Sequence, residues 1–378
     1  MSSAIPSTIL CVHPNRELYG SDRTFLQAVR AFRSRWPDAV ITALIPGDGL
    51  LADALQQLDI GIQVRFDNIF VLRRSNILTL PRELLALRRR IGAARRTMAG
   101  CDLVYINTVV VLDFLLASRA RRAATLVHVH ELPVGVTRWV FDRLLARARG
   151  RIVFISDAVR REFRASAARG QVIWNGTRAS SVAAPAGASL ALNILLIGRF
   201  NAWKGQGILL DALSTLTPAQ RVGLRVRIVG SAFGDQHHFT DAIKDKVKEH
   251  DLGDIVAIEP FALSPEHHYR WADVVVVPSV KPEPFGLVAI EGMAAGRPVI
   301  ASAHGGLAEI VKHDLTGLLF APGDPASLAE ALSRYAIDHA LVQRHGEAAR
   351  ARFEAEFDER IHMQRLADAA AEALAAST

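Results

Sequence analysis

Cysteine is scarce in this sequence. The 378 residues contain two cysteines, Cys11 inside an apolar run and Cys101 beside Asp102. Two isolated cysteines supply neither a disulfide framework nor the ligand spacing of a structural zinc site. The scarcity excludes a small secreted domain held together by disulfides, and a reducing, cytoplasmic location is expected.

Long hydrophobic runs are also lacking. No stretch approaches the roughly 18 consecutive apolar residues that span a bilayer. The first residues, Met1–Pro6, show no basic region followed by an apolar stretch. We therefore expect neither a signal peptide nor a transmembrane helix.

The first 180 residues contain no lysine. They hold 27 arginines against 14 acidic residues, whereas the rest of the chain holds 18 basic and 24 acidic residues, so the net charge of +7 is the sum of a cationic half and an anionic half. A cationic half favours an anionic partner, such as a phosphorylated substrate or a membrane surface. The alternative is a solvated arginine surface without a partner. Nucleic acid is not expected, because no nucleic-acid-binding motif accompanies the arginines and aromatic residues are not interleaved with them.

Length and pattern indicate two α/β domains, because 378 residues exceed one ordinary core. Apolar strand-like runs alternate with helical patterns in both halves, which is typical of doubly wound parallel sheets covered by helices. The expected strands are 8–12, 40–45, 103–106, 125–129 and 151–155 in the first half, and 193–197, 226–229, 256–258, 274–277, 299–301 and 317–320 in the second. The main expected helices are 22–35, 81–96, 207–216, 240–250, 265–271, 287–295 and 325–335.

A segment rich in alanine and serine, residues 181–191, separates the two halves and contains Pro185 and Gly187, as is typical of a linker. We therefore expect an N-terminal domain over residues 1–180 and a C-terminal domain over residues 192–355. The tail, residues 356–378, belongs to a helical pattern that begins near residue 352, and we expect it to return to the N-terminal domain. Ligands in such folds bind at the carboxyl ends of strands, so the expected site lies in a cleft between the domains.

One strand–loop–helix unit has a composition suited to an anionic ligand. The apolar strand 274–277 leads through a proline-containing loop to a helix that begins at Leu287. Gly286 allows the backbone to approach a ligand at the helix N-terminus, where amides favour a phosphate. Glu283 precedes this anion site, and Glu291 follows it by about 7 to 8 Å along the helix. The two carboxylates can therefore contact different parts of one extended ligand.

The string from Glu283 to Glu291, Glu-Pro-Phe-Gly-Leu-Val-Ala-Ile-Glu, resembles the E-x7-E signature of retaining glycosyltransferases of family 4, which have the GT-B fold. The strings Ala-Gly-Arg-Pro-Val-Ile-Ala-Ser at 295–302 and His-Gly-Gly-Leu-Ala-Glu-Ile at 304–310 add to the resemblance. It implies an α/β architecture of two doubly wound Rossmann-like domains that face a cleft, with the acceptor bound by residues 1–180 and the nucleotide sugar by residues 192–355. It also implies that Glu283 contacts the donor sugar, that Glu291 binds the ribose, and that the amides of Gly286 and Leu287 meet the distal phosphate.

A second loop follows the strand 193–197 and carries two cations, Arg199 and Lys204, among glycines. A planar guanidinium and an ammonium suit a nucleoside diphosphate, although an isolated pair of this kind is usually solvated. The string Gly-Arg-Phe-Asn-Ala-Trp-Lys-Gly at 198–205 is similar to the G-R-x4-K-G segment of the family. The resemblance implies that both cations bind the donor phosphates.

Gly20 and Ser21 are expected at the N-terminus of the helix 22–35, and an alternative role for Asp22 is that of an N-cap and nothing more. The pair resembles the family's N-terminal glycine loop, which implies that its backbone amides reach the donor diphosphate. Because the second small residue here is a serine, a less close approach is expected.

In the string 126–133, His128 and His130 are expected on one face of a strand, and Glu131 on the other face as the strand ends. Two histidines are candidate ligands of a metal ion, but no third ligand is spaced nearby. The resemblance favours His130 as the catalytic residue beneath the transferred sugar, and leaves open whether it is a general base, a hydroxyl binder or an orienting group. His128 is expected in the core.

The sequence contains no Asp-x-Asp motif, so the usual holder of a Mg²⁺ or Mn²⁺ bridge to the diphosphate is lacking. We expect no cofactor and a metal-independent reaction, in which Arg199, Lys204 and helix N-termini neutralise the leaving group. The resemblance implies retention of configuration by a front-face reaction. Base contacts are expected near Phe261, where Pro260 and Phe261 replace the family's usual glycine, so UDP and GDP donors both remain open.

The expected helix 81–96 carries leucine and isoleucine beside Arg88, Arg89, Arg90, Arg95 and Arg96, as a membrane-surface helix does, but an ordinary amphipathic helix has the same pattern. With the resemblance, this favours a saccharide or lipid-linked saccharide acceptor in surface polysaccharide, lipopolysaccharide or glycolipid synthesis. The enzyme would then be peripheral on the inner face of the cytoplasmic membrane. The alternatives are another GT-B enzyme, such as a nucleotide-sugar epimerase or a free-disaccharide synthase, and an inactive sugar-binding scaffold, against which the intact site residues argue.

Overall fold

The computed structural model describes residues 5–58, 61–71, 80–120, 124–180, 191–232, 236–261 and 264–377, without the side chains of 80–85. The chain divides into two compact units. The first comprises Met1–Asn175 together with Arg360–Thr378, and the second comprises Gly176–Glu359. The expected linker, residues 181–191, lies outside the described residues except for Ala191.

The first unit is built on a seven-stranded parallel sheet in the order β3-β2-β1-β4-β5-β6-β7. Its strands are β1 (Thr8–Val12), β2 (Val40–Ile45), β3 (Ile62–Phe66), β4 (Leu103–Asn107), β5 (Ala124–Val129), β6 (Arg151–Phe154) and β7 (Gly170–Val172). The inner strands β4 and β5 are buried along their whole length, because helices cover both faces of the sheet. The sequence patterns did not predict the edge strands β3 and β7, which are partly exposed and lack a continuous apolar run.

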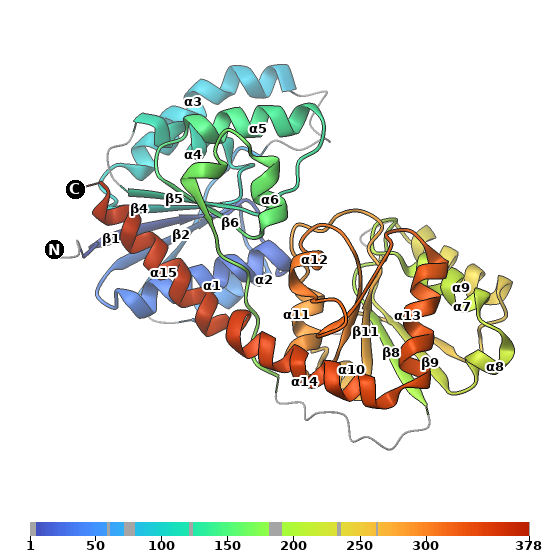
Figure 1. The fold of residues 1–378 in the computed structure, drawn as a ribbon. Helices are drawn as coiled ribbons and strands as arrows, with labels where there is room; N and C mark the ends of the chain where they lie inside the picture. Colours follow the sequence, from blue (N-terminus) through green and yellow to red (C-terminus); the bar gives the residue numbers. More distant parts are fainter. Residues whose placement is uncertain are drawn as a thin grey trace. The chain divides into compact units, whose positions relative to one another are not determined.

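Helices cover both faces of this sheet, as Figure 1 shows. One face carries α1 (Gly20–Arg35), α2 (Leu50–Gln56) and α15 (Glu359–Ala375), and the other carries α3 (Leu80–Met98), α4 (Leu112–Ala117), α5 (Val136–Arg147) and α6 (Asp157–Glu162). Phe25 and Phe32 of α1 pack in one core with Leu366 and Leu374 of α15. The C-terminal helix is therefore part of the hydrophobic core of the first unit.

The terminal helix expected over 356–378 corresponds to α15, which is separate from the helix before it. The structure has two helices here, α14 (His339–Glu356) and α15, separated at Phe357 and Asp358. At the break, the amide of Thr177 donates to the Phe357 carbonyl at 3.0 Å and the amide of Glu359 donates to the Thr177 carbonyl at 2.8 Å. These bonds to a distant segment replace bonds that a continuous helix would make within itself.

The second unit is built on a six-stranded parallel sheet in the order β10-β9-β8-β11-β12-β13. Its strands are β8 (Leu192–Ile197), β9 (Leu224–Val229), β10 (Val256–Glu259), β11 (Val274–Val277), β12 (Val299–Ser302) and β13 (Gly317–Phe320). Helices α7 (Gln206–Thr215), α9 (His238–Glu249) and α13 (Pro325–Ile337) cover one face, and α10 (Glu266–Trp271), α11 (Leu287–Ala294) and α12 (Leu307–Ile310) lie on the other. The short α8 (Pro218–Arg221) precedes β9.

Both sheets are doubly wound, which confirms the expected fold class of two Rossmann-like domains. The strand order reverses between β1 and β4 in the first unit and between β8 and β11 in the second. Such a reversal opens a crevice at the carboxyl ends of the two neighbouring strands, where ligands of doubly wound folds bind. Each unit therefore offers one position for a site.

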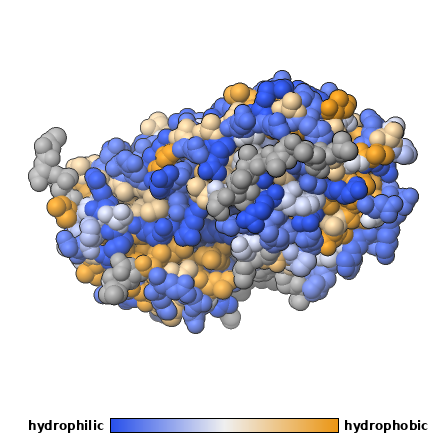
Figure 2. Space-filling model, turned by 90° about the horizontal axis from the view of Figure 1, so that it is seen from below, coloured by the Kyte–Doolittle hydropathy of each residue, from blue (hydrophilic) through white to orange (hydrophobic). Residues whose placement is uncertain are grey.

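None of the helices within the described ranges is both long and apolar enough to cross a membrane. Hydrophilic residues cover most of the face drawn in Figure 2, and hydrophobic residues gather on it in separate groups. Exposed apolar residues of this kind are normal on a globular protein.

Substitution of Gly205 tests how closely the loop after β8 packs against the loop after β11. Its φ is +75°, and a Cβ here would lie 1.8 Å from the carbonyl oxygen of Pro278, whereas Gly296, with φ +68°, has open space around it. We predict that Gly296→Ala lowers the unfolding free energy by roughly 1–2 kcal/mol, the cost of a left-handed residue with a side chain. Gly205→Ala should lower it by roughly 2 kcal/mol more, because the two loops must separate. Chemical denaturation of both variants measures the difference, and equal losses would contradict the close packing.

Candidate functional site

The second unit places two polar loops side by side at its point of strand reversal. β8 and β11 are parallel neighbours, so their carboxyl ends lie at the same edge of the sheet. β8 leads into the loop that carries Lys204, and β11 leads into the loop that carries Glu283. The two loops come from distant parts of the sequence and meet only through this strand pairing.

Lys204 and Glu283 form the centre of this arrangement. Lys204 Nζ lies 2.7 Å from Glu283 Oε1, and Ser279 Oγ donates to the same oxygen. The side chains of Lys204 and Glu283 are 31% and 14% exposed, so a ligand can reach the pair. His304 Nε2 donates to the carbonyl of Ser279 at 2.8 Å, which ties a third loop to the same place. An ammonium has three donors, so Lys204 can bind another anion while it contacts Glu283.

The backbone around Lys204 is held by short-range and cross-loop bonds. Asn201 Oδ1 accepts the amides of Trp203 at 2.8 Å and of Lys204 at 3.0 Å, which forms a tight turn. The amide of Val280 donates to the Trp203 carbonyl at 2.8 Å, which joins the loop after β8 to the loop after β11. The position of Lys204 is therefore set before any ligand binds.

Two glycines after β12 hold the backbone of Glu283. The amide of Gly306 donates to the Glu283 carbonyl at 2.8 Å. A Cβ at Gly305 would lie 2.5 Å from that carbonyl oxygen, and one at Gly306 would lie 2.6 Å from Cα of Phe285. A side chain at either position would push the Glu283 loop away, so the two glycines allow a contact that fixes the carboxylate.

Gly286 forms the N-cap of α11 with a φ of +139°, and no side chain caps this helix end. A Cβ at Gly286 would lie 2.6 Å from Leu307 Cδ2, so glycine is also needed for packing against α12. The first turn of α11, which begins at Leu287, thus offers backbone amides and the positive end of the helix dipole. Phosphate binding by Gly286 and Leu287 remains a prediction.

Glu291 lies in α11, and its carboxylate has a protein donor. Tyr269 of α10 donates from Oη to Glu291 Oε2 at 2.7 Å. Tyr269 is only 4% exposed, whereas Glu291 is half-buried. The ribose-binding role of Glu291 stays a prediction, but its carboxylate is oriented.

Two further predicted residues of the second unit have exposed side chains. Arg199 follows β8, and its backbone carbonyl accepts from Gln206 Nε2 at 3.0 Å. Phe261 follows β10, is 48% exposed, and donates its amide to Ser231 Oγ at 3.2 Å. These contacts fix the backbone at both positions, while the roles of Arg199 in phosphate binding and of Phe261 in base binding remain predictions.

In the first unit a buried polar network lies at the carboxyl ends of β1 and β4. Asn107 Nδ2 contacts His13 Nδ1 at 2.7 Å and the carbonyl of Ser21 at 3.1 Å. Because an amide nitrogen only donates, His13 Nδ1 accepts, and the ring carries its proton on Nε2, 2.8 Å from Asp22 Oδ1. Burial lowers the pKa of His13, against the opposing effect of Asp22, so the ring is neutral at pH 7.

The network also holds the start of α1, which begins at Gly20 with Ser21 in its first turn. The N-cap role considered for Asp22 is wrong, because Tyr19 occupies the N-cap and Asp22 is the third residue of the helix. Asp22 Oδ2 accepts the amide of Tyr19 at 2.9 Å. Burial alone would raise the pKa of Asp22, but hydrogen bonds from His13 and other donors outweigh it and lower the pKa. Asp22 therefore stays ionised and ties the helix start to His13.

His130 joins the same network from the end of β5. Its Nε2 lies 2.8 Å from Asn107 Oδ1, and because this oxygen only accepts, Nε2 carries the proton and Nδ1 does not. Burial, with a smaller contribution from His13, lowers the pKa of His130 to about 3. The ring is therefore neutral at pH 7. It can accept a hydrogen bond at Nδ1, but it is too weakly basic to take a proton completely.

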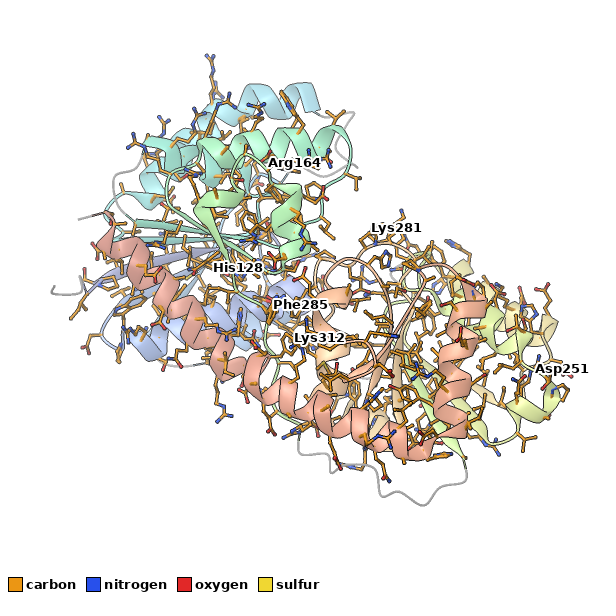
Figure 3. All side chains as sticks on the ribbon, in the orientation of Figure 1. His128, Arg164, Asp251, Lys281, Phe285 and Lys312 are labelled. Atoms are coloured by element: carbon orange, nitrogen blue, oxygen red, sulfur yellow. The ribbon has the colours of Figure 1, made fainter. Side chains whose placement is uncertain are left out.

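His128 lies in the interior of the first unit, as expected for a core residue (Figure 3). Its Nδ1 lies 2.8 Å from the hydroxyl of Tyr105. Glu131 Oε2 accepts the amides of Val109 at 3.2 Å and of His130 at 3.1 Å. Burial raises the pKa of Glu131 to about 7, against the effect of these bonds. Glu131 thus orients the backbone beside His130.

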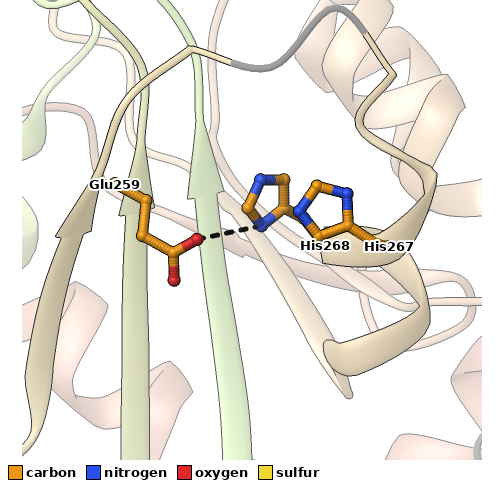
Figure 4. Close-up of side chains that lie close together, drawn as sticks. All are labelled: Glu259, His267 and His268. Carbon is orange, nitrogen blue, oxygen red and sulfur yellow. Dashed lines mark ion pairs between the residues drawn. The ribbon is translucent and has the colours of Figure 1, made fainter.

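Glu259, His267 and His268 form a group in the described part of the chain that could hold a metal ion (Figure 4). One ligand atom of each residue lies within 4.8 Å of the others, and His268 Nδ1 is 3.6 Å from Glu259 Oε2. Glu259 Oε1 is already paired with Arg227 Nε at 3.1 Å, and the Arg227 guanidinium stacks 4.0 Å from the centre of the Trp271 ring. Because this guanidinium neutralises Glu259 and repels a cation, we interpret the group as an ion-pair cluster.

The structure thus distributes the predicted residues over both units. Gly20, Ser21 and His130 lie in the first, and Arg199, Lys204, Phe261, Glu283, Gly286, Leu287 and Glu291 lie in the second. Lys204 and Glu283, two residues predicted separately, are brought into direct contact by the structure.

Sequence reasoning missed Ser279, Asn107 and Tyr269. Ser279 and Asn107 each lie at or just after the carboxyl end of an apolar parallel strand, and a polar residue in this position is a usable signal. Tyr269 has no such signal, because its contact depends on how α10 packs beside α11.

The second unit of the chain matches the model of a known protein family. The model of the family described as glycosyl transferases group 1 matches residues 191–352. The D-inositol 3-phosphate glycosyltransferase of Frankia alni is 40% identical over 146 residues, which are 37% of this chain and 36% of that protein. The enzyme of the same name from Kineococcus radiotolerans is 34% identical over 232 residues, 53% of this chain and 52% of that protein. The chain therefore spans about a third to a half of these relatives.

Solved structures resemble the chain over nearly its whole length. HepE of Anabaena in complex with UDP has a TM-score of 0.79 at 23% identity, covering 96% of this chain and 98% of that one. A glycosyltransferase of Rickettsia africae has a TM-score of 0.80 at 20% identity, covering 97% and 98%. Sucrose-phosphate synthase of Thermosynechococcus elongatus has a TM-score of 0.75 at 23% identity, covering 95% and 97%. Residues 191–352 thus match the group 1 glycosyl transferases, and the whole chain has the two-domain GT-B fold.

Proposed function

We propose that this protein is a retaining glycosyltransferase, which moves a hexose-type sugar from a UDP- or GDP-sugar to a saccharide or lipid-linked saccharide acceptor. The contact between Lys204 and Glu283 carries the proposal, because at the strand reversal of the second unit it joins a cation suited to phosphate to a carboxylate suited to sugar hydroxyls. The match of residues 191–352 to the group 1 glycosyl transferases supports it. The UDP and UDP-glucose complexes of HepE support a nucleotide-sugar donor.

The donor diphosphate would be bound by cations and backbone amides. Lys204 keeps donors beyond the one directed at Glu283, and Arg199 adds a planar guanidinium from an exposed position on the same loop. The first turn of α11 adds backbone amides and the helix dipole. Charge that develops on the leaving phosphate is stabilised by such groups when they are already in place.

Glu283 and His130 are the two side chains to which we assign sugar binding, one in each unit. Glu283 is held by Ser279 and Lys204 at its carboxylate and by Gly306 at its carbonyl, so it can accept sugar hydroxyls without reorganising. His130 presents an unprotonated Nδ1, because its Nε2 proton is directed at Asn107. We assign His130 the binding and orientation of a sugar hydroxyl.

The proposed reaction is a front-face substitution. The bond between the sugar C1 and the leaving phosphate oxygen breaks, and a bond from the acceptor oxygen to C1 forms on the same face. The acceptor's proton passes to the leaving phosphate oxygen, so no protein base is needed. A His130 whose pKa is about 3 fits this scheme better than general-base catalysis at neutral pH.

The acceptor would approach the basic first unit. Figure 1 shows α3 and α5 on the same face of its sheet. We define the α3/α5 surface by the exposed arginines Arg88, Arg89, Arg95, Arg96, Arg138 and Arg143, with the exposed apolar residues Val136 and Trp139. Leu84 and Leu85, the expected apolar residues at the start of α3, lie among the side chains that are not described. Arginines beside an exposed tryptophan suit an anionic membrane surface, and we propose that the α3/α5 surface rests on one.

A second candidate acceptor is a small phosphorylated sugar or polyol. The names of the relatives favour it, since one is a D-inositol 3-phosphate glycosyltransferase and another is a sucrose-phosphate synthase. The same arginine excess of the first unit would serve a phosphate group on a soluble molecule. Incubating a donor sugar with lipid-linked and with phosphorylated soluble acceptors separates the two candidates.

Nucleotide binding is the first test. UDP, GDP or a sugar derivative at about 100 times its dissociation constant should raise the unfolding free energy by about 2.7 kcal/mol, seen as a thermal shift. Lys204→Ala should weaken this binding roughly tenfold, since a charge-assisted bond to phosphate is lost. Lys248→Ala removes an exposed lysine from α9 and should leave the affinity unchanged. The absence of a shift with every nucleotide and nucleotide sugar would overturn the proposal.

Product stereochemistry and metal dependence test the mechanism. An α-linked donor should yield an α-linked product, and the rate should persist in excess chelator, because Lys204, Arg199 and α11 replace a metal. Anomeric NMR of the first product reads the configuration. Inversion would contradict the front-face scheme, and abolition of activity by chelator with recovery on addition of Mn²⁺ would contradict the metal-independent one.

Vesicle sedimentation tests the α3/α5 surface. The protein should bind vesicles that contain anionic lipid at low salt and dissociate at high salt, because the attraction is screened. Trp139→Ala should lower the bound fraction, whereas Ile337→Ala, which removes an 85% exposed apolar residue from the second unit, should not. Lack of binding at low salt would contradict the proposed membrane binding and favour a soluble phosphorylated acceptor.

A further inference from the structure

Tyr269 and Glu291 form a hydrogen bond that has no role in the proposed reaction. Tyr269 Oη donates to Glu291 Oε2 at 2.7 Å, from α10 to α11. Tyr269 is 4% exposed, so its side chain is enclosed by the protein and has little freedom to leave this position. A phenol has one proton, and here it is directed at a carboxylate, which makes the bond charge-assisted. One oxygen of Glu291 is therefore held by the protein.

Arg297 holds the helix that carries Tyr269. Its Nε donates to the Tyr269 carbonyl at 3.0 Å, and its Nη2 donates to the Arg270 carbonyl at 3.3 Å. These are carbonyls of the last turn of α10, which a helix cannot pair within itself. The Arg297 side chain is 1% exposed, and burial lowers its pKa, while the charge of Asp273 opposes the decrease. A buried guanidinium thus caps the C-terminal end of α10.

The Arg297–α10 and Tyr269–Glu291 hydrogen bonds together connect the core to the candidate ligand site. Arg297 fixes the end of α10, α10 places the phenol of Tyr269, and the phenol orients Glu291. A free glutamate in the second turn of a helix would sample several rotamers, and binding would lose about 0.5–1.5 kcal/mol in ordering it. A carboxylate that is already oriented avoids this loss.

We propose that Tyr269 is a positioning residue, which sets the carboxylate of Glu291 to accept the ribose hydroxyls of the donor and so makes the site select ribonucleotides over deoxyribonucleotides. This inference rests on the proposed function, in which Glu291 binds the ribose. A site built to bond a hydroxyl rejects the analogue that lacks it, because its own polar group then stays without a partner. Arg297 supports this selection indirectly, through its hold on α10.

The test combines a change in the protein with a change in the ligand. Calorimetric titration of the full-length protein with UDP and with its 2′,3′-dideoxy analogue should show a preference for UDP of about tenfold or more, which about 1.4 kcal/mol would produce. If the protein prefers GDP, the guanosine pair replaces these ligands. Tyr269→Phe should weaken UDP binding several-fold and leave the affinity for the dideoxy analogue unchanged, so that the preference falls. In turnover, KM for the donor should rise while kcat changes little.

Two further variants sharpen the test. In Glu291→Gln the preference should already be low, and adding Tyr269→Phe should reduce it little further, because both changes act on one carboxylate. Tyr335→Phe is the matched control. Tyr335 is a fully buried tyrosine of the same unit, whose hydroxyl lies 2.8 Å from His345 Nδ1. Its loss should leave both nucleotide affinities unchanged.

The outcomes separate this inference from the proposed function. Equal weakening of UDP and its dideoxy analogue in Tyr269→Phe would show a purely structural role and overturn the inference. An unchanged preference in Tyr269→Phe would also overturn it, with nucleotide binding intact. A wild-type protein that binds UDP without any ribose preference would overturn the ribose role of Glu291 and the inference with it. A wild-type protein that binds no nucleotide would overturn the proposed function itself.

Discussion

The parallel pairing of β8 with β11 is the constraint on which the candidate site depends. It places the loop of Lys204 beside the loop of Glu283, although the two residues are far apart in the sequence. The close approach of the two loops requires Gly205, where a Cβ would overlap the backbone of Pro278. The pairing, the glycine and the ion contact therefore act together, and the positive end of α11 completes a surface suited to a diphosphate.

Both units have a doubly wound parallel sheet, but the polar groups at their strand reversals differ in charge and burial. At its strand reversal the second unit presents an ion pair that a ligand can reach. The first unit presents a buried network of His13, Asn107 and His130, in which both histidines are neutral at pH 7. A site that must stabilise a leaving diphosphate needs charge, whereas a site that orients sugar hydroxyls needs hydrogen-bonding groups of fixed direction. The burial of each network matches the task proposed for it.

Preorganisation is common to all parts of the site. Glu283 is held by Ser279, Lys204 and the backbone of Gly306, and Glu291 is held by Tyr269. The glycines near these residues allow backbones to approach within distances that any side chain would prevent. Their presence in the sequence is thus explained by packing between loops, and any contact with a ligand comes in addition. Catalysis gains from such order, because little must move when charge develops.

The sequence by itself determined the two α/β domains, the inner strands and the loop residues around Glu283, because continuous apolar runs and glycine- or proline-containing loops are local signals. It did not reveal the edge strands β3 and β7, whose partly exposed residues lack such a run. Only the tertiary structure decided that the C-terminal helix breaks at Phe357, that Asp22 pairs with His13, and that Tyr269 reaches Glu291. Each of these depends on hydrogen bonds between separate segments, and no local pattern records which segments the folded chain brings together.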